Sequence, residues 1–315
     1  MSNKNNLSVV ISAYNEQKHI KDCLESVRDL ADEIIFIDNT SEDDTLKIAK
    51  KYTDKVFTHP NNPMLNINKN YGFTKASCDW ILNLDADERV TSELANEIRE
   101  VIGCKSQVTS HKPIQGYWIP RKNMIFGKWI QNDMWWPDYQ LRLFKKGKGS
   151  FPEQHVHEYL TVQGETEKLR ESILHINYSS IDQFINKIGL YTDNETEQVL
   201  SSGRKIIWLD AIRFPAKDFI KTFFAQKGYR DGLHGLVLSI LQAFYAEIVF
   251  VKIWEKQGFT EENNKTFLKE VYKEFIKIAL EIRYWFLSIL IEQASNPFKK
   301  IFYRLQRKNI TRKLK

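Results

Sequence analysis

The first hundred residues alternate between short apolar runs and longer amphipathic patterns, and this alternation most limits the folds that the chain can adopt. β-rich runs cover residues 7–12, 33–38, 55–58 and 79–84, and helical patterns cover approximately residues 16–28, 42–51, 64–76 and 92–102. Strands that alternate with helices form a parallel sheet with helices packed on both of its faces. We therefore expect an α/β domain at the start of the chain.

The pattern changes in the second half of the chain. Aromatic strands are expected at residues 117–121 and 139–145, but from about residue 180 onward only helical patterns remain. The Ser-Ser-Gly sequence at residues 201–203 has the composition of a hinge. We place the boundary loosely within 180–203 and divide the chain into residues 1–190, which carry the sheet, and residues 191–315, which are helical.

Three of the expected strands end in polar side chains. The sequence Ser-Ala-Tyr-Asn-Glu occupies residues 12–16 after the first strand, Asp38 ends the second, and Asp-Ala-Asp-Glu occupies residues 85–88 after the fourth. In an open parallel sheet, ligands bind beyond the carboxyl ends of the strands. A rim that needed only turns would not require this many carboxylates, so we expect a binding site there.

Asp85 and Asp87 are separated by one small residue directly after a buried strand. Two carboxylates in this position can share a hard cation such as Mg²⁺ or Mn²⁺, which prefers oxygen ligands and often completes its shell with phosphate oxygens. The cation would neutralise the charge that develops on a departing diphosphate. The alternatives are that Asp85 caps the following helix or that the cluster is a solvated turn.

Three further side chains fit a nucleotide at the same rim. The Asp38 carboxylate can accept a hydrogen bond from a base or a ribose, although it can also form an Asx-turn with the residues that follow. The ring of Tyr14 can lie against the base. Lys69 can reach the phosphates, but a lone helical lysine is as often solvated.

Several stretches together resemble the family 2 glycosyltransferases of the GT-A fold, in particular the bacterial branch that contains lipopolysaccharide-core β-1,4-glucosyltransferases. The stretches that carry the resemblance are residues 8–16, 37–45, 79–89, 140–144, 156–158, 173–175 and 227–232. The resemblance covers approximately residues 7–255. It implies a Rossmann-like mixed sheet with flanking helices, followed by a C-terminal helical region.

The resemblance also implies an activity and a set of site residues. It implies inverting transfer of a hexose, with glucose as the first candidate, from a UDP-sugar, with Mg²⁺ or Mn²⁺ as the cofactor. The nucleotide-sugar site would comprise Ala13, Tyr14, Asn15, Glu16, Asp38, Lys69, Asp85 and Arg142. The sequence departs from the family where Asn39 and Thr40 occupy positions that often include glycine.

An inverting transfer needs a carboxylate that takes the proton of the acceptor hydroxyl. Asp138 and Glu158 are the candidates, and we favour Glu158 because it follows a glycine-containing loop, where the base of the family usually lies. We expect a single histidine, His175 or His157, to complete a metal shell with Asp85 and Asp87. A zinc pair formed by His155 and His157 is disfavoured, and His175 could instead be a hydrogen-bonded core residue.

The C-terminal region has the character of a membrane surface element. Residues 233–246 are almost free of charge, but Glu247 interrupts the run, so a helix in a bundle or in the membrane interface is favoured over a crossing. Residues 299–315 contain eight lysines and arginines and no acidic residue, although the whole chain has a net charge of only +6. Such a tail suits an anionic membrane surface, and it does not indicate a nucleic-acid groove. A solvated tail is the alternative.

The cysteines and the N-terminus favour a location in the cytoplasm. Cys23, Cys78 and Cys104 are scattered, which disfavours both disulfides and a zinc site, and the first apolar run has the length of a strand rather than of a signal peptide. We therefore expect an enzyme that is peripheral on the cytosolic face of the inner membrane and acts on a lipid-linked or lipopolysaccharide-core acceptor. The alternatives are a protein or polysaccharide acceptor, or a nucleotidyltransferase, which would normally carry a glycine-rich loop after the first strand.

Overall fold

The computed structural model describes residues 6–62, 64–103, 113–153, 158–260 and 265–314. The chain divides into two compact units. The first, here called the sheet unit, comprises Met1–Ile130 and Trp135–Ser179, and the second, the helical unit, comprises Gln131–Met134 and Ser180–Lys315. The predicted boundary between residues 190 and 191 falls inside α5 (Ile181–Ser201), a single helix of the helical unit.

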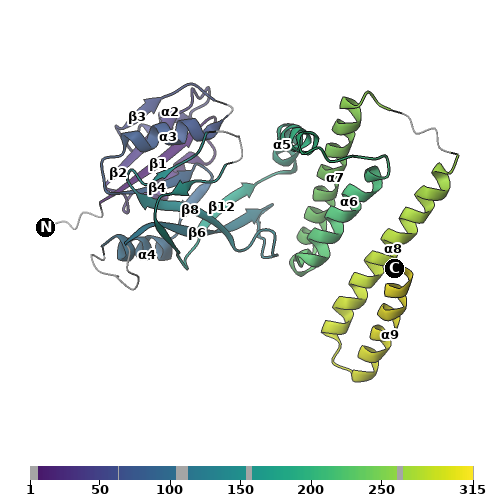
Figure 1. Cartoon of the computed structure of the whole chain (residues 1–315). Helices are drawn as coiled ribbons and strands as arrows, with labels where there is room; N and C mark the ends of the chain where they lie inside the picture. Colours follow the sequence, from purple (N-terminus) through teal and green to yellow (C-terminus); the bar gives the residue numbers. More distant parts are fainter. Residues whose placement is uncertain (1–5, 63, 104–112, 154–157, 261–264, 315) are drawn as a thin grey trace. The chain divides into compact units, whose positions relative to one another are not determined.

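A mixed sheet forms the centre of the sheet unit, as the sequence predicted (Figure 1). In the described residues its strands follow the order β3-β2-β1-β4-β8-β6-β12-β5, with β7 and β11 also paired to β6. These strands are β1 (Leu7–Ala13), β2 (Glu33–Asp38), β3 (Val56–Thr58), β4 (Trp80–Asp85), β5 (Glu88–Val90), β6 (Ile114–Ile125), β7 (Lys128–Trp129), β8 (Asp138–Lys145), β11 (Glu165–Lys168) and β12 (Ile173–Tyr178). The short strands β9 (Gly149–Ser150) and β10 (Thr161–Val162) form a separate pair.

The first four strands are parallel and the rest of the sheet is mixed. β1 lies between β2 and β4 and is parallel to both, whereas β8 is antiparallel to β4 and to β6. The runs that form β1 and β2 are almost wholly buried, as expected for parallel strands that are covered on both faces. The carboxyl ends of β1, β2 and β4 consequently lie side by side at one rim.

Helices cover both faces of the sheet. They are α1 (Ile20–Val27), α2 (Thr45–Ala49), α3 (Leu65–Lys75) and α4 (Ser92–Gly103). Apolar side chains of α1 and α4 join one buried cluster with Val9 and Leu82, and Phe73 of α3 joins the other with Val10 and Ile81. This separation follows from the alternation of side chains along a strand.

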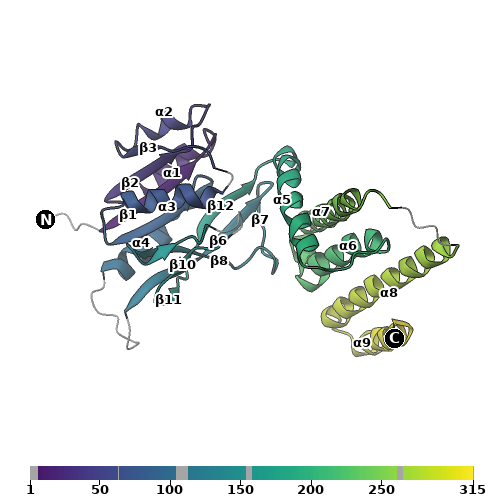
Figure 2. The same ribbon diagram turned by 45° about the horizontal axis from the view of Figure 1, so that its top comes forward.

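Helix α3 packs against β1 and β2, as can be followed in Figure 2. A Cβ atom added to Gly72 would lie 2.5 Å from Cγ1 of Val10 and 3.1 Å from Cγ1 of Ile37. A larger residue at this position would collide with the buried side chains of Val10 and Ile37, so glycine permits the close approach. Because α3 also carries Asn66 and Lys69, the packing at Gly72 determines how far these two side chains reach over the rim.

The helical unit contains long helices and two short irregular turns. They are α5 (Ile181–Ser201), α6 (Asp210–Phe219), the π-helix η1 (Ile220–Ala225), the 3₁₀ turn η2 (Gly228–Asp231), α7 (Leu233–Lys256), α8 (Phe267–Gln293) and α9 (Pro297–Leu314). Helices α5 and α6 pack on α7, and α8 packs on α9. Arg213 of α6 joins α8 through a bidentate contact with Glu274, with both N–O distances at 2.8 Å.

Of the described helices, only α7 is long and apolar enough to cross a membrane. Length and composition alone give weak support for a crossing, because a core helix can meet the same criteria. In the most apolar stretch of α7, 28% of the residues are buried within the chain itself. The preference for a bundle or interfacial helix over a crossing stays a prediction.

Candidate active site

The carboxyl ends of three strands meet at one rim, as the alternating pattern predicted. Ala13 of β1 lies opposite Asp38 of β2, and Ser12 lies opposite Asp85 of β4. The residues that the sequence placed after three separate strands are therefore neighbours in space. The position of the candidate site follows directly from the parallel register of β1.

The loops after β1 and β2 are joined by hydrogen bonds. The backbone N–H of Asn15 donates to Ser41 Oγ at 3.1 Å, and the N–H of Glu42 donates to Asn15 Oδ1 at 2.8 Å. The N–H of Glu16 donates to Thr45 Oγ1 at 2.8 Å. Asn15 and Glu16, both predicted to bind the donor, thus join the loop after β1 to the loop after β2 through their backbone N–H groups.

Ala13 and Tyr14 present different groups at the rim. The carbonyl of Ala13 accepts the N–H of Asn39 at 2.9 Å, so its backbone belongs to the loop framework. The Tyr14 side chain is 37% exposed. An exposed ring beside the end of β1 is suited to stacking on a base, which is the role expected for Tyr14.

Asp38 forms the turn that the sequence left open as an alternative. Its carboxylate accepts the N–H of Ser41 at 3.3 and 3.4 Å, and the residue is only 1% exposed. Thr40 within this turn has a φ of 62°, in the left-handed region that a β-branched residue rarely adopts. This explains why glycine suits this stretch. A contact between Asp38 and a nucleotide stays a prediction.

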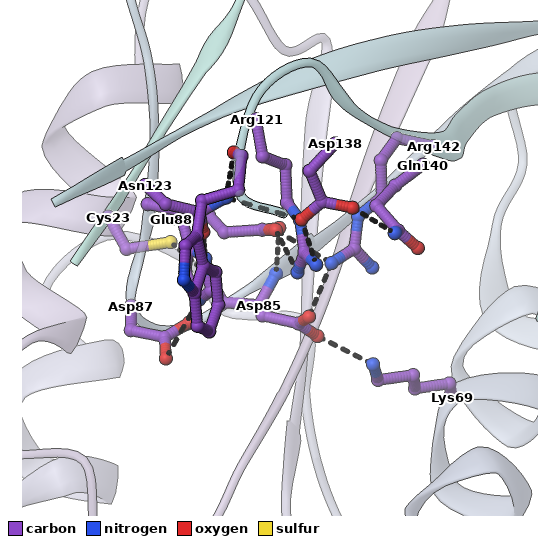
Figure 3. A network of polar contacts seen from close by, with 12 residues as sticks. Cys23, Lys69, Asp85, Asp87, Glu88, Arg121, Asn123, Asp138, Gln140 and Arg142 are labelled. Carbon is purple, nitrogen blue, oxygen red and sulfur yellow. Dashed lines mark hydrogen bonds and ion pairs between the residues drawn. The ribbon is translucent and has the colours of Figure 1, made fainter. Parts of the chain in front are cut away.

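Asp85 is paired with two cations (Figure 3). Lys69 Nζ lies 2.6 Å from Oδ1 of Asp85, and Arg142 Nη2 bonds Oδ2. Burial alone would raise the pKa of Asp85, but the charges of Arg142 and Lys69 hold that pKa well below its usual range. Lys69 is therefore an ion-pair partner at the rim and not the solvated helical lysine that was the alternative.

The fully buried Glu88 contacts both Asp85 and its partner Arg142. Its carboxylate accepts the N–H of Asp85 at 3.0 Å and Arg142 Nη2 at 2.7 Å, and Arg121 Nη1 lies 3.7 Å away. Opposite charges thus alternate along a chain of contacts. Sequence reasoning assigned no role to Glu88 or Arg121, although Glu88 stands next to Asp87 and charged residues are seldom fully buried unless paired.

Asp138 is held by several donors at once. It accepts Arg121 Nε at 2.8 Å, Gln140 Nε2 at 2.8 Å and Asn123 Nδ2 at 3.3 Å. Burial opposes ionisation, but Arg121, Gln140 and Asn123 outweigh it and lower the pKa of Asp138. A proton acceptor works best with a pKa near the working pH, so this geometry favours a structural role for Asp138.

Glu158, the favoured base, is partly exposed. A side chain of α3 contacts it, and another side chain of the same helix contacts Asp85. Asn66 Nδ2 lies 3.4 Å from Oε2 of Glu158, which also accepts the N–H of Glu153 at 2.7 Å. Asn66 and Lys69 are both on α3, roughly one turn apart. Helix α3 therefore links the candidate base to the candidate diphosphate site. His155 and His157 lie outside the described residues.

Asp87 and His175 face each other across the rim. His175 Nε2 lies 3.5 Å from Oδ2 of Asp87, while its Nδ1 lies 2.6 Å from Oδ1 of Asn123. Asn123 Nδ2 donates to the backbone carbonyl of Trp135 at 2.9 Å, which fixes the amide with its oxygen toward the ring. In this orientation the Asn123 oxygen accepts a hydrogen bond from Nδ1–H of His175, so that Nε2 is the ring nitrogen that faces Asp87.

This arrangement fits a divalent cation. Nε2 of His175 and the carboxylate of Asp87 face each other, and an imidazole nitrogen and a carboxylate oxygen are both ligand types that a divalent cation accepts. A carbonyl or carboxylate on the far nitrogen is also the usual support of a metal-bound histidine. Asp85, by contrast, is neutralised by Lys69 and Arg142, so its predicted role as a direct metal ligand is the least supported of the three.

The protein alone does not complete a metal shell in the part of the chain that the structure describes. No group of three or more His, Cys, Asp or Glu side chains there is arranged to hold a metal ion. Mg²⁺ commonly binds through one or two protein ligands together with water and substrate phosphates. Asp87 and His175 would supply two such protein ligands, and their role in binding metal stays a prediction.

Comparisons with known proteins found one family model and several similar proteins. Residues 8–148 match the family model described as Glycosyl transferase family 2. The lipopolysaccharide core biosynthesis glycosyltransferase LpsC of Rhizobium meliloti (strain 1021) is similar over most of both chains. It is 26% identical over 265 residues, which cover 82% of this chain and 95% of the relative.

Two solved structures share more distant similarity. S. aureus TarS 1–349 in complex with UDP has a TM-score of 0.42 and 16% sequence identity, and the match covers 82% of this chain and 93% of that one. Glucosyl-3-phosphoglycerate synthase from Mycobacterium tuberculosis, in complex with Mn²⁺ and UDP-glucose, has a TM-score of 0.30 and 22% identity. That match covers 37% of this chain and 43% of the synthase. The family match spans residues 8–148, and this part of the chain contains the strands β1, β2 and β4 whose carboxyl ends form the rim with Asp85 and Asp87.

Proposed function

We propose that this enzyme transfers a hexose, with glucose as the first candidate, from a UDP-sugar to a hydroxyl of a lipid-linked or lipopolysaccharide-core acceptor. The acceptor class is supported by the similarity to LpsC, which extends over 82% of this chain and so beyond residues 8–148. The observation that carries the transfer chemistry is that α3 contacts both Asp85, through Lys69, and Glu158, through Asn66.

The donor would bind with its diphosphate at the rim. Asp87 and His175 would hold Mg²⁺ or Mn²⁺, and this cation would stabilise the charge on the departing diphosphate. The ring of Tyr14 would stack on uracil, and the framework around Asp38 would accept the ribose. Lys69 lies 2.6 Å from Asp85 and would exchange part of that ion pair for a phosphate oxygen when the donor arrives.

Glu158 would act as the base. Its carboxylate takes the proton of the acceptor hydroxyl while the oxygen forms a bond to the anomeric carbon, and the bond from that carbon to the diphosphate breaks on the opposite face. The products are UDP and a glycoside of inverted configuration. Asn66 Nδ2, at 3.4 Å from Oε2, would keep the carboxylate oriented toward the acceptor.

The location at a membrane belongs to the same proposal. The basic residues of α9 and the apolar faces of the helical unit suit a peripheral attachment to an anionic surface on the cytosolic side. A lipid-linked acceptor would be presented at that surface.

The decisive experiment is a donor and acceptor screen with the full chain. UDP release would be followed with UDP-glucose and related UDP-sugars, with Mg²⁺ or Mn²⁺, and with core oligosaccharide, polysaccharide or peptide acceptors. The proposal expects release to rise when a core or lipid-linked acceptor is added. Stimulation by a peptide or polysaccharide alone would assign a different acceptor. If no UDP-sugar led to release of UDP, the assignment of a UDP-sugar as the donor would be wrong.

A further inference from the structure

A basic pocket lies between α8 and α9 in the helical unit. Its volume is about 440 Å³, and it is lined by Tyr284, Arg304, Arg307, Lys308, Thr311 and Arg312. Among the residues that the structure describes, none of these lining side chains is acidic. A pocket of this size with four cationic side chains and two hydroxyls is suited to an anion that carries several acceptor oxygens.

One of the arginines is held in place. Arg307 lies with its guanidinium carbon 5.6 Å from the centre of the Tyr284 ring, and its Nη1 lies 3.2 Å from Oγ of Ser288. The cation–π contact and the hydrogen bond to Ser288 both limit the motion of the guanidinium, whose remaining N–H donors can bind a ligand. A planar fork of this kind matches the oxygens of a phosphate, which it can bind through two hydrogen bonds.

The same helix has an exposed apolar stripe beside the pocket. The stripe consists of Phe298, Ile301, Phe302 and Leu305, each more than half exposed. These positions recur at helical spacing, and at about 100° per residue the centre of the stripe lies roughly a quarter of a turn from the centre of the pocket residues of α9, with Arg312 at the border between the two. Helix α9 thus carries the exposed apolar stripe, the pocket residues beside it, and a side with the buried Ile310 that packs in the hairpin with α8 (Figure 2).

A basic pocket with an apolar stripe beside it is complementary to a lipid, which joins an anionic headgroup to an apolar chain, and not to a free anion. The acyl boundary of a bilayer lies directly beneath its phosphates, and an interfacial helix buries its apolar face there while its basic face meets the headgroups. We propose that the pocket of Tyr284, Arg304, Arg307, Lys308, Thr311 and Arg312 binds the phosphate headgroup of a membrane lipid while the apolar stripe of α9 enters the acyl boundary.

The pocket favours a terminal phosphate. A phosphomonoester presents three oxygens and a higher negative charge than a phosphodiester, and the pocket offers several donors from different directions. The inference rests on the membrane attachment in the proposed function and not on the sugar transfer.

The test measures binding of the full chain to vesicles by flotation, without donor sugar. Phosphatidylcholine vesicles would contain either phosphatidic acid, a phosphomonoester, or phosphatidylglycerol, a phosphodiester, adjusted to the same surface potential. We expect about tenfold tighter binding to the phosphatidic acid vesicles, as for one additional charge-assisted hydrogen bond. Equal binding to the two vesicle types would overturn the assignment of the pocket as a site for a terminal lipid phosphate.

Two triple variants separate the pocket from general attraction to negative charge. R304Q/R307Q/R312Q removes three pocket charges, and K299Q/K300Q/K313Q removes three charges from the same helix outside the pocket. The first should lose the preference for phosphatidic acid, and the second should weaken binding to both vesicle types and keep the preference. An equal response of the two triples would show a diffuse basic surface and contradict the proposal.

Two controls keep the result interpretable. Arg304 and Arg312 are exposed, so R304Q/R312Q would replace the first triple if that variant did not fold, as judged by thermal unfolding. Calorimetry with inorganic phosphate and pyrophosphate tests the free anion as the source. Tight binding of either, without a preference among vesicles, would overturn the lipid assignment. UDP release in the donor and acceptor screen is measured without vesicles, so a failure of the proposed transfer is distinguished from a failure of lipid binding.

Discussion

Nη2 of Arg142 lies 2.7 Å from Oε1 of Glu88, and both side chains are buried beneath the rim of the sheet. Glu88 also accepts the N–H of Asp85, and Arg142 also bonds the Asp85 carboxylate. Glu88 therefore holds Asp85 both directly and through Arg142. The loop that carries Asp85 and Asp87 is oriented by a carboxylate that does not itself reach the rim.

Replacing Glu88 with glutamine should destabilise the fold. The substitution leaves the buried charges of Arg142 and Arg121 with less compensation, and we expect the free energy of unfolding to fall by about 2–4 kcal/mol. Urea denaturation measures this change. Glu165→Gln on the exposed strand β11 is the matched control and should change stability by less than about 0.5 kcal/mol. A Glu88→Gln protein as stable as the control would refute the supporting role.

Replacing Asp87 with alanine should abolish turnover while the protein stays folded. If Asp87 and His175 hold the cation, turnover should fall by at least about 100-fold, because the charge on the diphosphate is no longer neutralised. UDP release and thermal unfolding would be measured on the same sample. Asp44→Ala, at an exposed aspartate, is the control, and it should retain normal turnover.

Removal of divalent metal should have the same effect as the Asp87 variant. A chelator should stop turnover of the wild-type protein, and added Mn²⁺ or Mg²⁺ should restore it. Added metal should not rescue Asp87→Ala. Normal turnover in that variant, or undiminished activity in the presence of chelator, would end the assignment of Asp87 to metal.

Glu158→Gln and Asp138→Asn should fail in different ways. Glu158→Gln should bind the UDP-sugar normally but lose transfer by about 100-fold or more, because the acceptor hydroxyl has no base. Asp138→Asn should instead lower the free energy of unfolding by about 1–3 kcal/mol, because Arg121 loses a charged partner. Donor affinity, transfer rate and urea unfolding separate the two outcomes. Loss of transfer in a fully stable Asp138→Asn protein would instead identify Asp138 as the base.

The rim could be predicted from the sequence because it depends on local order along the chain. Asp38 and Asp85 follow apolar runs that can only be buried strands, and parallel strands bring their carboxyl ends together. The mixed sheet and the helices that follow it confirm the predicted fold class. The turn at Asp38 was left open because an Asx-turn and a nucleotide contact require the same residue.

The support beneath the rim could not be predicted because it depends on register between distant strands. His175 lies opposite Glu88 on one side and Asn123 on the other, through the pairing of β12 with β5 and β6. No period in the sequence specifies that β6 extends over Ile114–Ile125 or that Arg121 points toward Glu88. A one-residue shift in register would send these side chains to the other face of the sheet.

Glu33 should make stability depend on pH at the opposite edge of the sheet. Its carboxylate, at the start of β2, is bonded by Lys55, by Ser8 of β1 and by the N–H and Oγ of Ser77. Burial opposes ionisation, but these partners, Lys55 foremost, lower the pKa of Glu33 from 4.5 to about 2. A carboxyl whose pKa is depressed on folding stabilises the protein above its unfolded pKa and loses that contribution as the pH falls through its folded pKa.

The difference in stability between the wild type and Glu33→Gln should therefore be largest above about pH 5. It should shrink as the pH falls from 4.5 toward about 2, where Glu33 becomes protonated in the folded protein. Urea denaturation of both proteins across this range measures the gap. Turnover at neutral pH should be unchanged, because Glu33 lies at the amino end of β2 and the rim lies at its carboxyl end. A gap that stays constant with pH would show that the contribution of Glu33 does not come from its charge.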